Sequence, residues 1–176
     1  MTIDFTNSVI LPENLPVLEA AEFNPVDPKY LKILYINHLI FGLIIGMSAL
    51  VLLFMLDEKI PGFTWLVSAG LFVGIMVCSL IITRLSFSKR GYLIREKDIA
   101  YQRGLIRYKL TSIPFNRIQH VELIQSVIAK RMDLATIKVY TAGSSSDDLE
   151  IPGLTLGAAR QIREFLTGKI SPDEQA

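Results

Sequence analysis

The sequence predicts an α+β membrane protein, in which a two-helix transmembrane hairpin precedes a small antiparallel β domain with a C-terminal helix. Two 24-residue stretches, 33–56 and 60–83, contain no Asp, Glu, Lys or Arg. Residues 84–170 then show short segments of alternating apolar and polar residues, and the last segment has helical spacing. The composition agrees, because 51% of the 176 residues are hydrophobic and the mean hydropathy is +0.40.

Residues 1–32 are expected to form an acidic N-terminal arm. The first 28 residues contain five acidic residues, four prolines and neither Lys nor Arg. This composition favours an extended chain that lies on the membrane or on the second domain. Residues 171–176 are expected to form a short tail.

Each uncharged stretch is long enough to span a membrane. As an α-helix, 24 residues extend about 36 Å, whereas a hydrocarbon core is about 30 Å thick. Only Asp57, Glu58 and Lys59 separate the two stretches, so the helices must form a tight antiparallel hairpin. Residues 33–83 are therefore interpreted as a membrane anchor.

The distribution of Lys and Arg around the hairpin predicts its orientation. Lys29 and Lys32 precede the first span, and a cluster of four cations follows the second, whereas the connecting turn has only Lys59. By the positive-inside rule, both termini should lie in the cytoplasm. The four cations after the second span are Arg84, Lys89, Arg90 and Arg95.

Each span also carries a Gly-x-x-x-Gly pair, Gly42 and Gly46 in the first and Gly70 and Gly74 in the second. Small residues one turn apart allow close approach of helix backbones in lipid. The simpler interpretation is that the two pairs pack the hairpin against itself. The alternative is that at least one pair mediates oligomerisation. His38, near the cytoplasmic end of the first span, is expected to make a structural hydrogen bond.

Residues 84–170 are predicted to fold as one compact β-rich domain. A short helix is expected within 126–133, and a C-terminal helix follows Thr155, which is available as its N-cap, and ends at Gly168. Strands are expected at 92–94, 98–103, 105–110, 117–124, 136–141 and 149–151.

This domain resembles the bacterial pleckstrin-homology-like family of membrane-flanked domains, the YdbS-like proteins. The resemblance rests on five stretches: Tyr-Gln-Arg-Gly-Leu-Ile at 101–106, Ile-Pro-Phe-Asn-Arg-Ile-Gln-His-Val-Glu at 113–122, Gln125 through Leu-Ala-Thr at 134–136, Val-Tyr-Thr-Ala-Gly at 139–143 and Ile-Pro-Gly-Leu at 151–154. It implies a partly open barrel of two orthogonal sheets, closed at one end by the C-terminal helix. It also implies a bacterial membrane protein that binds or scaffolds, and it does not imply a reaction. Ser126 and Asp133 stand where the family pattern often has glycine, which affects one connector only.

The charge of the second domain points to an anionic neighbour. Residues 84–170 contain fifteen Lys or Arg and eight Asp or Glu, although the whole chain has a net charge of only +1. Because the domain is tethered to a membrane, anionic lipid is favoured over nucleic acid. Arg84, Lys89 and Arg90 are the candidate head-group ligands, although a purely topological role also explains them.

No catalytic, cofactor or metal motif is recognised. The sequence lacks a phosphate-binding loop, a dinucleotide fingerprint and a His-Glu-x-x-His motif, and one Cys and two His argue against a transition-metal centre. The Ser144–Ser146 run is interpreted as a solvated hairpin loop. His120 and Glu122 share one side of a strand, but His120 is expected to make a structural hydrogen bond inside the barrel.

Three functional hypotheses follow. The first is a non-catalytic scaffold that assembles with itself or with another membrane protein. The second is a module that senses anionic lipid of the inner leaflet, and the third is a membrane enzyme that depends on His120.

Overall fold

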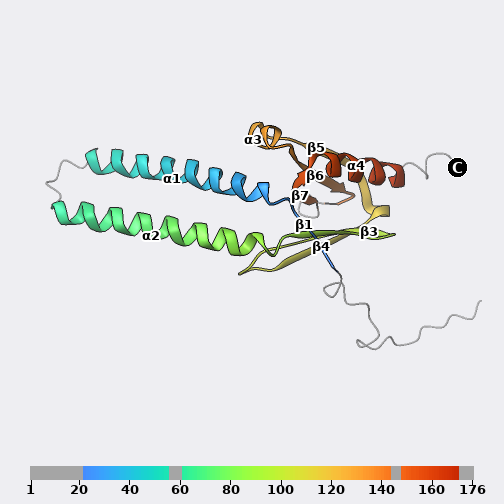
Figure 1. The fold of residues 1–176 in the computed structure, drawn as a ribbon, viewed down its shortest axis with the longest axis horizontal. Helices are drawn as coiled ribbons and strands as arrows, with labels where there is room; N and C mark the ends of the chain where they lie inside the picture. The colour runs from blue at the N-terminus through green and yellow to red at the C-terminus, as the bar shows by residue number, and fades with distance from the viewer. Residues whose placement is uncertain (1–21, 56–60, 144–147, 171–176) are drawn as a thin grey trace, which may run out of the picture.

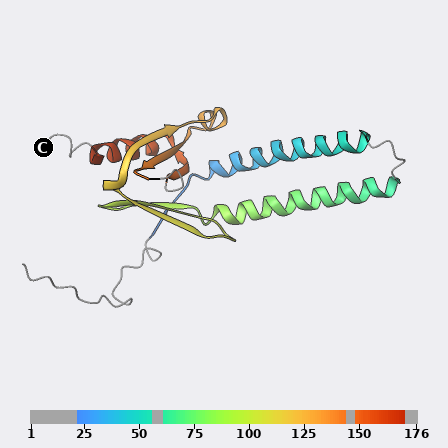
Figure 2. The ribbon, with the colours of Figure 1, turned by 180° about the vertical axis from the view of Figure 1, so that it is seen from behind.

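The computed structural model describes residues 22–55, 61–143 and 148–170 of the chain. Two long helices, α1 (Lys29–Met55) and α2 (Gly62–Phe87), lie side by side and extend away from a β-rich domain (Figure 1). The same arrangement is visible from behind in Figure 2. The predicted turn at Asp57–Lys59 falls outside the described residues.

The two helices confirm the predicted transmembrane hairpin. Both are long and apolar enough to cross a membrane. They contain 27 and 26 residues, so each extends about 40 Å. Within the described protein α2 buries none of its residues, which is typical of a helix whose apolar surface is solvated by lipid. Both helices extend beyond the predicted spans, 33–56 and 60–83, at the end next to the domain. Helix α1 begins at Lys29, and α2 ends at Phe87.

The domain contains two antiparallel sheets. The first has the order β1 (Asn24–Pro25), β2 (Gly91–Ile94), β3 (Asp98–Arg103) and β4 (Lys109–Pro114). Asn24 pairs with Tyr92, so the described end of the N-terminal arm adds an edge strand to this sheet.

The second sheet has the order β5 (Ile118–Ile124), β6 (Leu134–Thr141) and β7 (Leu149–Thr155). Among the described strands, no ladder joins this sheet to the first. The sheets therefore do not close into a barrel, although the predicted class, a membrane hairpin followed by a pleckstrin-homology-like domain, is confirmed.

Short helical segments connect the strands. The 3-10 turn η3 (Phe115–Arg117) links the two sheets, and α3 (Val127–Arg131) links β5 to β6. The C-terminal helix α4 (Leu156–Ile170) follows β7. The backbone N–H of Ala158 donates to Oγ1 of Thr155 over 3.2 Å, as expected for the predicted N-cap.

Several predicted boundaries are wrong. The strand expected from 105 begins at Lys109, because Gly104 adopts a φ of 100° and residues 104–108 form a connecting loop. The strand expected to end at 151 continues through Pro152 to Thr155, since β7 is an edge strand and tolerates a missing N–H. The C-terminal helix passes the expected stop at Gly168, which lies in an exposed last turn.

The core lies between the two sheets and α4. Alternate residues of the strands point inwards, and Ile99, Ile137 and Ile151 are fully buried. Helix α4 contributes Leu166, and its Phe165 ring meets Phe115 edge to face, with centroids 5.7 Å apart. This packing holds α4 against the sheets.

Candidate functional site

The two glycine pairs of the hairpin have different surroundings. A Cβ atom on Gly42 would lie 2.6 Å from Sδ of Met76, and one on Gly46 would lie 3.4 Å from Cζ of Phe72, so this pair faces α2. At Gly70 and Gly74, no described atom lies within 4 Å of the corresponding position. The two glycine faces therefore do not pack against each other, contrary to the simpler interpretation of the sequence.

A cleft of about 910 Å³ lies between α1 and α2. Gly42 and Gly46 line it together with large apolar side chains such as Phe72. Arg84 and His38 also line it. Gly42 and Gly46 therefore contact α2 beside this cleft, whereas Gly70 and Gly74 do not line it.

His38 connects the two helices at the domain end. Its Nδ1 lies 2.9 Å from the carbonyl oxygen of Leu34, and its Nε2 lies 3.2 Å from Oγ1 of Thr83 in α2. These contacts satisfy both ring nitrogens within the hairpin. The geometry fits the structural hydrogen bond expected for this residue.

The three candidate head-group ligands do not form one cluster of free cations. Arg84 and Lys89 are exposed. Arg90 is half-buried, its Nε is shielded from solvent, and its guanidinium lies over the ring of Tyr30, 5.7 Å from the centroid. Arg90 thus contacts the start of α1 within the protein.

Arg90 belongs to a joint that fixes the domain to the anchor. The N–H of Asp27 donates to the carbonyl oxygen of Gly153 over 2.8 Å. The Tyr30 ring covers Gly153 so closely that a Cβ atom there would lie 2.5 Å from Cγ of the ring. Burial raises the pKa of the Tyr101 hydroxyl, and the nearby charge of Arg90 opposes this shift. The sequence prediction missed this joint, although Gly153 lies in the Ile-Pro-Gly-Leu motif.

His120 lies on the exposed face of the second sheet and not inside the domain. Its ring stacks on Tyr140 with centroids 4.1 Å apart, and Nε2 lies 3.6 Å from a carboxylate oxygen of Glu122. The Tyr140 hydroxyl donates to the other Glu122 oxygen over 2.9 Å, and Lys138 lies above the Tyr140 ring. The expectation of a hydrogen bond inside the barrel is therefore wrong, because the β5 register turns His120 outwards opposite Tyr140.

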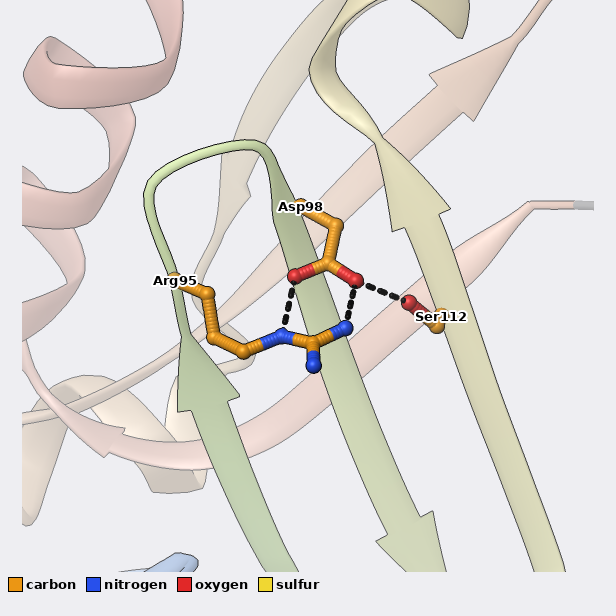
Figure 3. A network of polar contacts seen from close by, with 3 residues as sticks. All are labelled: Arg95, Asp98 and Ser112. Atoms are coloured by element: carbon orange, nitrogen blue, oxygen red, sulfur yellow. Dashed lines mark hydrogen bonds and ion pairs between the residues drawn. The ribbon is translucent and has the colours of Figure 1, made fainter. Parts of the chain in front are cut away.

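A polar network braces the end of the first sheet farthest from the helices (Figure 3). Arg95, at the β2–β3 turn, makes two charge-assisted hydrogen bonds to the carboxylate of Asp98, and Ser112 of β4 donates to the same carboxylate over 2.7 Å. The hydrogen bond from Arg95 is the main reason that the pKa of Asp98 is lowered, and Ser112 adds to it. This network joins three consecutive strands.

Within the part of the chain that the structure describes, no group of three or more His, Cys, Asp or Glu side chains could hold a metal ion. The loop predicted at Ser144–Ser146 lies outside the described residues. The candidate functional features are therefore the transmembrane hairpin, the joint between the domain and the anchor, and the cations at the domain end of the two helices.

Two transmembrane helices followed by a two-sheet domain and a C-terminal helix define a membrane-anchored pleckstrin-homology-like protein. A family model described as "Bacterial PH domain" matches residues 34–170, and the chain belongs to this family. The chain is also similar to the UPF0699 transmembrane protein YdbS of Bacillus subtilis (strain 168), with 26% identity over 149 residues, 82% of this chain and 90% of the relative. The comparison with solved structures gave no significant match.

The family is not a catalytic one, and the relative is a transmembrane protein. The protein is accordingly a membrane-associated module of a non-catalytic family.

Proposed function

We propose that this protein is a scaffold of the bacterial inner membrane, which assembles through its transmembrane helices with itself or with another membrane protein. Its pleckstrin-homology-like domain lies on the cytoplasmic face in this proposal, because the cations flank the domain end of both helices. Membership of the bacterial PH domain family supports a binding role over a catalytic one.

The observation that carries the proposal is the uneven use of the glycine pairs. Exposed apolar side chains give no driving force for association in lipid, because lipid tails are equally apolar. A face of small residues does give one, since it allows backbones to approach and pack closely. The side chains of Met76 and Phe72 cover Gly42 and Gly46 within the hairpin, whereas the Gly70 and Gly74 face of α2 is open to another helix.

The Gly70 and Gly74 face of α2 is separate from the cleft between the two helices. Phe72 and Met76 of α2 line that cleft, whereas neither Gly70 nor Gly74 does. Another helix can therefore pack on Gly70 and Gly74 without displacing the contacts that α1 makes with α2.

Size measurements on the full-length protein in several mild detergents test the proposal. Gly70→Leu with Gly74→Leu should convert an oligomer to a monomer while the circular dichroism spectrum is preserved. The matched variant, Gly42→Leu with Gly46→Leu, should instead lower the yield of folded protein, because the two leucines must displace the Met76 and Phe72 side chains that pack on these glycines. A wild-type protein that is monomeric in every detergent would overturn assembly with itself. A second protein that co-purifies with the wild type, and is lost only in the Gly70→Leu, Gly74→Leu variant, would support assembly with another protein.

A second candidate function is the sensing of anionic lipid. Arg84 and Lys89 are exposed beside the end of α2, where each cation contributes about 1 kcal/mol to attraction by an anionic surface. If the size measurement is repeated in detergent with added lipid, and assembly varies with the fraction of anionic lipid and not with the glycine substitutions, this function takes precedence.

A further inference from the structure

Two large apolar side chains of the domain are far more exposed than the others. Ile106, in the β3–β4 loop, is 84% exposed, and Val127, at the start of α3, is 77% exposed. Phe165 of α4, for comparison, is 43% exposed. We call residues 104–108 the β3–β4 tip and residues 125–133 the α3 tip.

Strand register places the β3–β4 tip at the membrane end of the first sheet. Strand β2 begins at Gly91, a few residues after α2 ends, and Gly91 pairs with Gln102 of β3. Strand β3 therefore runs back towards the membrane. Its last pair, Arg103 with Lys109, lies one residue closer to the membrane than Gln102 does. The β3–β4 tip projects beyond this pair, alongside the end of α2 (Figure 2).

The α3 tip reaches the same level on the other side of the anchor. The tip is followed by Leu134, which pairs with Thr155 of β7. Gly153, two residues before Thr155, accepts a hydrogen bond from the N–H of Asp27, two residues before α1 begins. The α3 tip therefore lies near the start of α1. In Figures 1 and 2, α3 and the β3–β4 loop point towards the helices from opposite sides of the pair. The two tips and the hairpin thus face one plane, the membrane surface that α1 and α2 enter.

The charges on both tips match an anionic membrane surface. Arg103, Arg107 and Lys109 surround Ile106, and Lys130 and Arg131 follow Val127; all five cations are exposed. The ion pairs found among the described residues are Arg95–Asp98 and His120–Glu122, so these cations are not neutralised within that part of the chain. Apolar side chains flanked by cations are typical of segments that insert at the head-group level of anionic bilayers.

We propose that the domain rests on the bilayer through both tips, with Ile106 and Val127 inserted among the lipids and the flanking cations at anionic head groups. The anchor holds the tips at the surface, so a weak contact at each tip is sufficient. Docking would fix the tilt of the domain relative to the membrane. This contact does not depend on the proposed assembly, because it uses neither glycine pair.

Tryptophan fluorescence of the full-length protein in liposomes tests the contact. In a Trp65→Phe background, the single tryptophan of Ile106→Trp or Val127→Trp should show blue-shifted emission and quenching by lipids brominated near the head group. The control variant Glu96→Trp, in the β2–β3 turn at the opposite end of the domain, should emit as in water. Emission at both tips equal to that of the control would overturn the proposal.

Charge variants and dilution with lipid show whether lipid or a second copy of the protein covers the two tips. In liposomes that contain phosphatidylglycerol, Arg107→Gln or Lys130→Gln should each lower the ratio of docked to undocked tips about fivefold. The paired control, Arg160→Gln with Arg163→Gln on α4, should leave quenching unchanged. Blue-shifted emission that brominated lipid does not quench, and that disappears when the protein is diluted with lipid, would mean that a second copy covers the tips and would refute lipid docking.

Discussion

The joint between Gly153 and Tyr30 should be the most sensitive point of contact between the domain and its anchor. Gly153 adopts a φ of 76°, which costs an alanine about 1 kcal/mol or more. The new Cβ would also lie 2.5 Å from the ring of Tyr30, and overpacking of this kind costs about 1–3 kcal/mol. Gly153→Ala should therefore destabilise the protein by at least about 2 kcal/mol.

Thermal unfolding in detergent, followed by circular dichroism, measures this loss. For a chain of this size, 2 kcal/mol corresponds to a decrease in Tm of at least about 4 °C. Gly157→Ala is the matched control, because no described atom lies within 4 Å of its Cβ position and the residue is helical. It should leave Tm unchanged or raise it slightly.

A double-mutant cycle then assigns the effect to the ring. Adding Tyr30→Ala to Gly153→Ala removes the collision, so the double variant should be at least about 1 kcal/mol more stable than the sum of the single effects predicts. Additive effects, or a Tm of Gly153→Ala equal to that of the control, would show that the ring does not hold Gly153 and would refute the joint.

Three further predictions concern the rest of the chain. The pKa of Asp98 is lowered in the folded protein, so its ion pair with Arg95 stabilises the fold fully above the ordinary carboxyl pKa near 3.9, and this stabilisation is lost as the pH falls through the folded pKa. Asp98→Asn should therefore lower the free energy of unfolding by about 1 kcal/mol at pH 7 and leave it unchanged at low pH. The control Glu96→Gln should not change Tm at either pH. Thr141 is 7% exposed and its Oγ1 has no hydrogen-bond partner among the described residues, so Thr141→Val should raise the free energy of unfolding by about 1 kcal/mol, and a decrease would show that the hydroxyl is satisfied. In a Cys78→Ser background, Glu58→Cys should react with a membrane-impermeant thiol reagent on intact cells and Glu96→Cys should not; the reverse would place the domain outside the cytoplasm.

The elements that the sequence predicted best are those whose pattern is local. Two uncharged stretches can only be stable as helices in lipid, and the alternation in β6, with the looser alternation in β5, reports the two faces of a sheet directly. The start of β4 was missed because Leu105 to Tyr108 resemble a strand in composition, whereas a positive φ at Gly104 breaks the pairing there.

The parts that could not be predicted depend on packing between distant segments. Which glycine pair of the hairpin is used depends on how α2 is rotated against α1, and both pairs have the same spacing in the sequence. The outward position of His120 follows from the register of β5 against β6, including an irregularity after Ile118, which no local pattern reveals. The contact of Tyr30 with Gly153 joins residues far apart in the chain.

Native mass spectrometry of the full-length protein released from lipid nanodiscs tests the central claim, assembly through α2, most directly. The chain has a mass of 19.7 kDa. We expect the wild type to appear as a defined multiple of this mass or bound to a second membrane protein, and the Gly70→Leu, Gly74→Leu variant to appear as a single folded chain. A wild-type spectrum that contains only single chains with retained lipid would contradict the scaffold account.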